Sequence, residues 1–447
     1  MQCVRAGWGA ESLRGRFARG ALWSLVGAVI SQATNLVASI ITARLLGREQ
    51  FGQYGMVQST VGMLATFAGL GLGVTATKYV AELRNRDPER AGRIIALSSL
   101  VAVCSGGLLA LLLVFLAPGL AASTLNAPAL ATELRIASVL LLLNAINGVQ
   151  TGALTGFEAF RAIARINLVR GLAAFPLTVT LVLLWRLPGA VWALAASAAI
   201  ACWLSQRALQ QCCAAAGLRT KLSSSWAERR VLWTFSTPAF LSGALVAPVT
   251  WIANTMLVNQ PGGYREMAIF AAASQWRNAV IFLPSLLLQP LLPLLSNLSG
   301  ERPQAFSRLL WGSVALVFAV SSCLSLPIIL YRLPVMSAYG RDFSSGGPVL
   351  AILLVSAILS VSVAPVGQAI AAQSAMWWGF ALNSLWAVVM LASAWLMVRP
   401  LGAEGLAWAW LLSYVAHAVS VSIYARYSFR RSHSDPAVNL ALPSLLH

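Results

Sequence analysis

The chain has 447 residues, of which 58% are hydrophobic and only 10% are charged, and its mean hydropathy is +0.76. Soluble domains carry about 25% charged residues, so this composition excludes an ordinary soluble protein. The net charge of +18 would suggest nucleic acid as a partner in a soluble chain, but the basic residues lie between long apolar runs. Nucleic acid is therefore excluded, and we predict an all-α polytopic membrane protein.

The apolar runs are continuous and long. A helix needs about 20 mostly apolar residues to cross the hydrocarbon core, whereas strands of a membrane barrel would alternate over about 10 residues. We expect twelve transmembrane helices: Ala21–Leu46, Gly52–Thr77, Ile94–Leu116, Ile136–Gly156, Ile166–Trp185, Gly189–Leu209, Val231–Val258, Met267–Leu298, Leu309–Tyr331, Val349–Gln373, Met376–Val398 and Ala403–Tyr424.

The distribution of Lys and Arg predicts the orientation. The two termini and the even-numbered loops, with the adjoining span ends, hold 22 of the 31 basic residues, and the odd-numbered loops, with their adjoining span ends, hold 8. Basic residues in short loops favour the cytoplasmic side during insertion. We therefore expect a bacterial cytoplasmic (inner) membrane protein with both termini in the cytoplasm, whose basic loops also contact anionic membrane lipids.

The longest charged connection divides the spans into two sets of six. The expected organisation is a cytoplasmic segment 1–20, an N-lobe 21–209, a cytoplasmic inter-lobe loop 210–230, a C-lobe 231–424 and a cytoplasmic tail 425–447. A shift of 215 residues aligns Gly47 with Gly262 and Pro88 with Pro303, which is a weak sign of an internal repeat. Six-helix halves of equal orientation are typical of transporters with a substrate site near the midplane between them, and we expect two lobes around a central cavity.

Polar residues follow one face of several predicted spans. Such residues are unfavourable in lipid and face either a neighbouring helix or a wet cavity. Hydrogen bonding between helices explains any one of them, whereas the combined stripes favour a hydrophilic cavity. The candidate lining residues are Gln32 and Asn35 in the first span, Asn144 and Asn147 in the fourth, and Ser274, Gln275 and Asn278 in the eighth.

Arg277 is the most informative residue. It lies about ten residues into the eighth span, near the bilayer midplane at ~1.5 Å per residue, and the acidic residue of that span, Glu266, is at its outer edge. A guanidinium without a carboxylate partner suits a phosphate. Snorkelling to the interface or bonding to backbone carbonyls is the alternative. Arg44 and Arg48 at the first outer junction are second-tier candidates, for headgroup contact or interface anchoring.

The acidic residues argue against other classes of protein. All thirteen lie in loops, tails or at span ends, whereas an ion-driven drug exporter would be expected to use a carboxylate within the membrane. A glycan polymerase would be expected to carry a large outer loop, and the predicted outer loops are short. The cysteines show no paired spacing, and we expect no metal, cofactor or catalytic residue.

Short motifs carry a resemblance to a known family. The run Ala43 to Gly55, "ARLLGREQFGQYG", resembles the junction of the first two helices in oligosaccharide flippases of the multidrug/oligosaccharidyl-lipid/polysaccharide exporter superfamily. The segments Gly69 to Gly71 and Lys78 to Glu82 are similar to the end of the family's second helix. The family's eighth helix is similar to three segments of this chain, Ala273 to Asn278, Phe282 to Pro284 and Leu292 to Ser296.

The resemblance implies a function. Members of the family move undecaprenyl-pyrophosphate-linked sugars from the inner to the outer leaflet by alternating access, for assembly of surface polysaccharide. The resemblance also implies that the substrate is a polyprenyl-pyrophosphate-linked glycan whose pyrophosphate is bound by Arg277. A polysaccharide polymerase and glycosyltransferases are the candidate partners. A drug or metabolite exporter of the same superfamily is the alternative.

Overall fold

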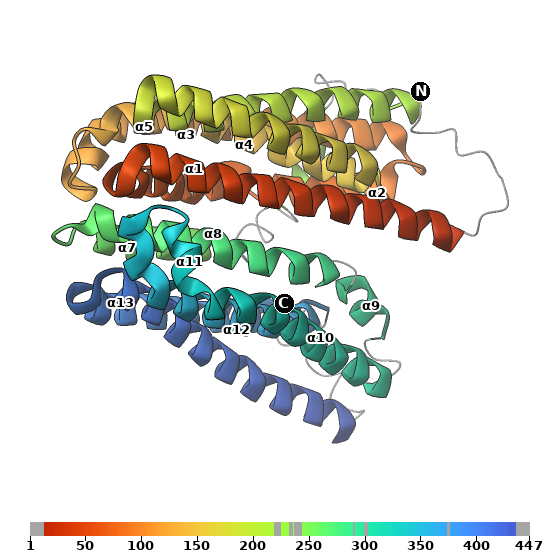
Figure 1. The fold of residues 1–447 in the computed structure, drawn as a ribbon. Helices are drawn as coiled ribbons and strands as arrows, with labels where there is room; N and C mark the ends of the chain where they lie inside the picture. Colours follow the sequence, from red (N-terminus) through yellow and green to blue (C-terminus); the bar gives the residue numbers. More distant parts are fainter. Residues whose placement is uncertain are drawn as a thin grey trace. The chain divides into compact units, whose positions relative to one another are not determined.

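The computed structural model describes residues 13–218, 225–231, 236, 244–288, 291–298, 303–372 and 376–434. Every regular element in these ranges is helical, which confirms the predicted fold class (Figure 1). The α-helices are α1 (Leu13–Gly69), α2 (Leu72–Leu83), α3 (Pro88–Gly119), α4 (Leu130–Gly156), α5 (Phe160–Ala215), α7 (Val246–Val258), α8 (Gly263–Leu288), α9 (Leu291–Leu298), α10 (Pro303–Leu330), α11 (Arg332–Ser337), α12 (Gly347–Ala372) and α13 (Met376–Ser434). Short turns of other helix types lie at Leu120–Thr124, Ser225–Glu228 and Arg341–Gly346.

All twelve expected spans have a helical counterpart in the described residues. Seven helical runs are long and apolar enough to cross a membrane. Three of these runs hold two spans each, separated by a sharp kink at Gly47 in α1, Arg186 in α5 and Gly402 in α13. The two remaining spans correspond to α7, which has 13 described residues, and to α8, which carries charged residues.

One span that we expected to be continuous is interrupted within the described residues. The second span breaks where Leu70 and Gly71 take positive φ values of 43° and 68°, so that α1 ends at Gly69 and α2 begins at Leu72. Glycine adopts a positive φ without a steric penalty, which explains why the helix ends at this glycine-rich segment. The eighth span corresponds to α8 and α9, and residues 289–290 between them lie outside the described residues.

The backbone of the two helical hairpins supports an internal repeat. Arg186 has φ 54° and ψ −128°, and Gly402, which is 216 positions further along, has φ 56° and ψ −129°. The helices that follow approach equivalent carbonyl groups, since a Cβ atom on Gly189 would overlap the carbonyl oxygen of Leu181 and one on Gly405 would overlap that of Met397. The repeat that is weak in sequence is therefore clear in backbone conformation.

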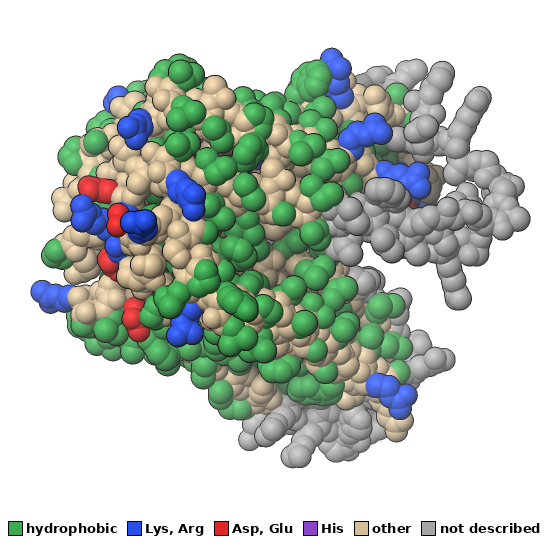
Figure 2. Space-filling view, viewed as in Figure 1, with side chains coloured by type: hydrophobic (Ala, Val, Ile, Leu, Met, Phe, Trp, Pro, Cys, Tyr) green, Lys and Arg blue, Asp and Glu red, His purple; other side chains and the backbone are tan. Residues whose placement is uncertain are grey.

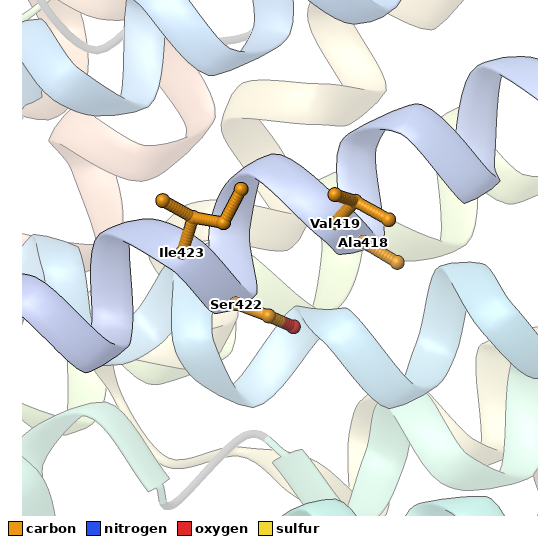
Figure 3. A pocket seen from close by; sticks show the side chains of 4 residues that line it. All are labelled: Ala418, Val419, Ser422 and Ile423. Atoms are coloured by element: carbon orange, nitrogen blue, oxygen red, sulfur yellow. The ribbon is translucent and has the colours of Figure 1, made fainter.

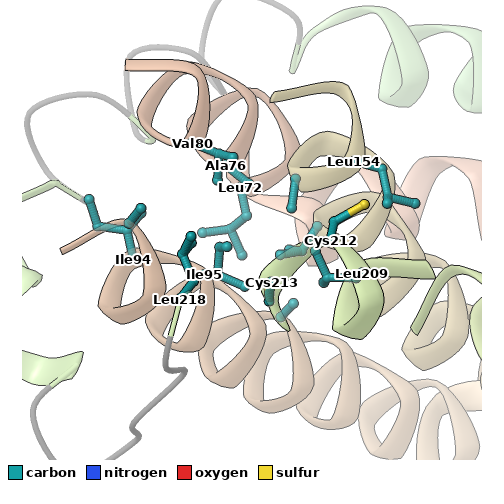
Figure 4. Packing of buried hydrophobic residues seen from close by; sticks show 14 of the residues in the cluster. Leu72, Ala76, Val80, Ile94, Ile95, Leu154, Leu209, Cys212, Cys213 and Leu218 are labelled. Atoms are coloured by element: carbon teal, nitrogen blue, oxygen red, sulfur yellow. The ribbon is translucent and has the colours of Figure 1, made fainter. Parts of the chain in front are cut away.

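The described chain divides into two compact units, residues 1–271 and 272–447. In the first unit, α1 packs on α5, α3 on α4, and α2 on α4. A buried apolar cluster joins α2, α3, α4 and α5, and its members include Leu72, Ile94 and Leu209 (Figure 4). In the second unit, α12 packs on α10 and α13, around buried Leu295 and Leu310.

The outer surface of each unit is apolar. Phe115 on α3, Leu183 on α5 and Trp395 on α13 are 79%, 65% and 72% exposed. On the face shown in Figure 2, most of the charged side chains lie toward the ends of the helices, and hydrophobic side chains cover the band between them. This surface is suited to contact with lipid chains.

Candidate functional site

Arg277 is buried inside the second unit. It lies near the middle of α8, and only 7% of it is exposed. Its Nε donates a hydrogen bond of 3.4 Å to the Ser356 hydroxyl of α12, which in turn donates to the carbonyl of Leu353. In the part of the chain that the structure describes, no carboxylate lies within ion-pair distance of Arg277. Among the described residues, the guanidinium is therefore held by a hydroxyl group and by aromatic rings and not by a carboxylate.

Aromatic rings support this guanidinium. Its central carbon lies 4.3 Å from the ring centroid of Trp410 and 5.5 Å from that of Tyr414. Trp386 completes the cluster, with its ring centroid 6.2 Å from that of Trp410 and 5.9 Å from that of Tyr414. The negative face of an aromatic ring attracts a cation and favours it more strongly where water is excluded. Sequence reasoning missed these three aromatic residues of α13.

The neighbours of Arg277 on α8 face different surroundings. Ser274 and Gln275 are half-buried, and Asn278 is exposed. Successive residues of a helix point about 100° apart, which explains how the side chain of Arg277 enters the bundle while Asn278 remains on its surface.

The predicted polar residues of the first unit do not form one cluster of hydrogen bonds. On α1, Gln32 is half-buried and Asn35 is exposed. On α4, Asn144 is half-buried, and the Oδ1 of Asn147 accepts a hydrogen bond of 3.1 Å from the Ser205 hydroxyl of α5. The bond at Asn147 is of the interhelical kind that commonly holds membrane helices together.

Arg44 and Arg48 lie at the kinked junction within α1. Arg44 is exposed, whereas Arg48 is partly buried and engaged with the start of α8. The Nε of Arg48 donates to the carbonyl of Arg265 at 2.9 Å, and its Nη2 lies 3.0 Å from the Oε1 of Glu266. The structure therefore brings Arg48 together with Arg265 and Glu266, which come immediately before the expected eighth span.

The surface hollow shown in Figure 3 is a different kind of feature. It is lined by Ala418, Val419, Ser422 and Ile423, all on α13, and has a volume of about 310 Å³. Three of these side chains are apolar and the fourth carries only a hydroxyl, so the hollow has no cationic group to bind phosphate. Within the described residues, no group of three or more His, Cys, Asp or Glu side chains could hold a metal ion.

Comparison with known sequences assigns the chain to a family. Residues 17–299 match the family described as polysaccharide biosynthesis protein. The chain belongs to this polysaccharide biosynthesis protein family. It is 25% identical over 438 residues to the EPS I polysaccharide export inner membrane protein EpsE of Ralstonia nicotianae, a match that covers 93% of this chain and 92% of that protein. The EpsE protein of Ralstonia solanacearum is 27% identical, with 86% and 87% of the two chains covered.

Solved structures agree on the fold of this family member. An inward-facing multidrug resistance MATE family transporter of the MOP superfamily has a TM-score of 0.79 at 16% identity, over 93% of this chain and all of the other. A MOP superfamily transporter from Pyrococcus furiosus, described as having a binding pocket of reverse polarity, has a TM-score of 0.66 at 13% identity, over 93% and 96% of the two chains. The resemblance read from the sequence is thus confirmed at the level of the polysaccharide biosynthesis family and of the fold.

Proposed function

We propose that this protein moves a polyprenyl-pyrophosphate-linked oligosaccharide from the cytoplasmic to the outer leaflet by alternating access, for the assembly of a surface polysaccharide. The observation that carries the proposal is the buried cation Arg277, which has no carboxylate partner among the described residues, in a chain whose family is that of polysaccharide biosynthesis. The EpsE relatives are named as polysaccharide export proteins of the inner membrane, which supports the same class of substrate and location.

The geometry of Arg277 is suited to binding an anion. A guanidinium binds phosphate through the N–H groups along its edge, whereas its flat face stacks on aromatic rings. Contact with Trp410 occupies the face, and the Nε on the edge donates to Ser356, so binding of a pyrophosphate would replace that bond with bonds to phosphate oxygen atoms. Because Arg277 is 7% exposed, access of the anion requires a rearrangement of the surrounding helices, as an alternating-access cycle provides.

In this proposal, the sugars and the polyprenyl tail of the substrate have surroundings other than Arg277. Amide and hydroxyl side chains such as Gln32, Asn35, Asn144, Ser274 and Gln275 would hydrate the sugars, while the polyprenyl tail remains in lipid. The basic bias of the termini and even-numbered loops places them in the cytoplasm in this proposal. A polysaccharide polymerase and glycosyltransferases are the proteins that would use and supply this substrate.

The membrane potential is the proposed driving force. Moving negative charge outward across an inside-negative membrane releases roughly 2.3 kcal/mol per charge for each 100 mV. A pyrophosphate diester carries two negative charges, so the potential alone favours the outer leaflet. A carboxylate within a span is not needed for coupling in this scheme.

The test is flipping in vesicles. The purified protein is reconstituted with a polyprenyl-pyrophosphate-linked oligosaccharide, and sugar that reaches the opposite leaflet is cleaved by an impermeant glycosidase. We expect Arg277→Ala to slow flipping by at least about tenfold, since a hydrogen bond to a charged group is worth about 1.5–3 kcal/mol, and Arg277→Lys to retain partial activity.

Arg207 provides a matched control, because its guanidinium carbon lies 3.9 Å from the centroid of the exposed Trp203 ring. Arg207→Ala removes an arginine from a tryptophan face at the surface and should leave flipping unchanged. Full activity of a correctly folded Arg277→Ala variant would contradict the anion site, and failure of the parent protein to flip the glycan would contradict the function itself.

A further inference from the structure

Two Arg-Glu dipeptides lie at equivalent helical junctions and pair crosswise. Arg48-Glu49 follows Gly47, which has φ 76°, and Arg265-Glu266 follows the turn at Gly262, which has φ 69°. The Nη2 of Arg48 lies 3.0 Å from Glu266, and the Nε of Arg265 lies 4.0 Å from Glu49. Each arginine therefore faces the glutamate of the other dipeptide. This is the reciprocal pattern of a self-complementary interface, here within one chain.

The backbone beneath this crossed pair is in close contact. A Cβ atom at Gly52 of α1 would overlap the carbonyl oxygen of Tyr264 in α8, and one at Gly55 would lie 3.0 Å from the Cβ of Ala271. Small residues allow helices to approach closely. The start of α8 therefore lies directly on α1, at the same end of the helices as the two ion pairs.

Hydrogen bonds extend this contact along α7. The Trp251 indole donates to the Thr60 hydroxyl at 3.0 Å, and the Asn254 amide donates to the Ser59 hydroxyl at 2.9 Å. Thr60 and Asn254 are 0% and 5% exposed. A hydroxyl and an amide that are buried in these bonds become accessible only if α7 moves away from α1.

We propose that the crossed Arg-Glu dipeptides form a latch that holds the α7–α8 junction against α1 and opens during the transport cycle. The latch deepens the proposed function and rests on it, because a substrate that leaves on the outer side needs this end to open. The basic bias of the loops predicts that both junctions lie on that side. The two ion pairs are partly or largely exposed, with side-chain exposures of 21% and 34% in one and 67% and 62% in the other. Such pairs are individually weak, which suits a contact that must break repeatedly.

The experiment measures opening without transport. Thr60→Cys is placed in a background in which the six native cysteines are replaced by serine or alanine. Its alkylation by an impermeant maleimide is then followed in membrane vesicles in which the outer side faces the medium. Because Thr60 is fully buried against α7, the rate of alkylation reports separation of α7 from α1.

Charge reversal tests the pairing. Arg48→Glu and Glu266→Arg should each raise the alkylation rate by about threefold or more, since each replaces an attraction with a repulsion. The double variant Arg48→Glu with Glu266→Arg should bring the rate back toward that of the parent. The control is Arg84→Glu, which breaks the pair of Arg84 with Glu158 at 2.7 Å and lies on a different junction, between α2 and α4. This control should leave the rate unchanged.

A steric variant tests the same latch without altering charge. Gly52→Ala should raise the alkylation rate, because the new methyl group overlaps the Tyr264 carbonyl, whereas Gly62→Ala on the same helix meets no atom within 4 Å and should have no effect. In the parent, the rate should also increase between low and high salt, since salt screens exposed pairs.

Rates that are unchanged in both charge-reversal variants, or a double variant as reactive as the singles, would overturn the latch. These outcomes are independent of the glycan. A protein that opens as described but fails to flip the lipid-linked glycan would contradict the proposed function and leave the latch in place.

Discussion

The guanidinium carbon of Arg277 lies 4.3 Å from the ring centroid of Trp410, and these two residues are separated by 133 positions in the sequence. One belongs to α8 and the other to α13, so the contact joins two helices of the second unit. A charge buried in an apolar bundle is unfavourable without compensation. The aromatic face provides part of that compensation while leaving the positive charge in place.

Replacing this ring should destabilise the protein. We expect Trp410→Leu to lower the free energy of unfolding by about 3 kcal/mol, from a lost cation–π contact of about 2 kcal/mol and imperfect repacking. Trp410→Phe should lose about half as much, because phenylalanine keeps a weaker aromatic face. Thermal unfolding of the purified protein measures both. Trp203→Leu, at the exposed pair with Arg207, is the control and should change stability by less than about 1 kcal/mol; an equal loss there would show that burial is unimportant.

The packing of α2 on α4 gives a second prediction. A Cβ atom at Gly152 would overlap the backbone of Gly73, whereas one at Gly148, one turn earlier on α4, meets no atom within 4 Å. We expect Gly152→Ala to cost about 1–3 kcal/mol through overpacking and to reduce the yield of folded protein in size-exclusion chromatography. Gly148→Ala should behave as the parent. Similar losses in the two variants would contradict the close contact as the cause, because helix propensity by itself favours alanine over glycine.

The kink in α5 gives a third prediction. Arg186 has φ 54° and ψ −128°, a backbone conformation that is unfavourable for any residue with a Cβ atom. Its Nη1 donates to the carbonyl of Leu45 at 3.1 Å. Arg186→Ala keeps the strain and loses the bond, whereas Arg186→Gly loses the bond and relieves the strain. The glycine variant should therefore be the more stable of the two by about 1–2 kcal/mol, measured by thermal unfolding. Equal stability would show that the kink stores no strain.

A fourth prediction concerns the driving force. In reconstituted vesicles with an imposed potassium diffusion potential, negative on the donor side, flipping of the pyrophosphate-linked glycan should be faster than at zero potential. The expected gain follows from roughly 2.3 kcal/mol per charge per 100 mV. Ionophores that collapse the potential should abolish the gain. A rate that is identical with and without the potential would rule out charge movement as the drive.

The sequence was sufficient to predict the helical class and the positions of the spans, because hydrocarbon thickness fixes the length of each apolar run. It also predicted the break at Arg186, which lies between the expected spans that end at Trp185 and begin at Gly189. It did not predict the break at Leu70, because the apolar run continues through Gly69 and Gly71 and a positive φ is uncommon for a residue other than glycine.

The candidate site was predictable only in part. Arg277 could be identified because a charged residue within an apolar span is rare. Its aromatic partners could not, since Trp386 and Trp410 in an apolar span resemble the tryptophans that face lipid. The crossed dipeptides did leave a signal: Arg-Glu occurs directly after Gly47 and again two residues after Gly263, at the two helical junctions. That signal becomes informative only once the two junctions are known to lie together.

The paired hairpin kinks have a consequence for protein engineering. At Gly402, the kink in α13 is occupied by glycine, which adopts this backbone conformation without strain. At Arg186, the equivalent kink in α5 is occupied by a residue whose side chain donates a hydrogen bond to α1. Each half of the chain can thus serve as the design template for the other. Exchanging short segments between the two hairpins would show which bends tolerate a side chain and which depend on glycine, without reference to any other protein.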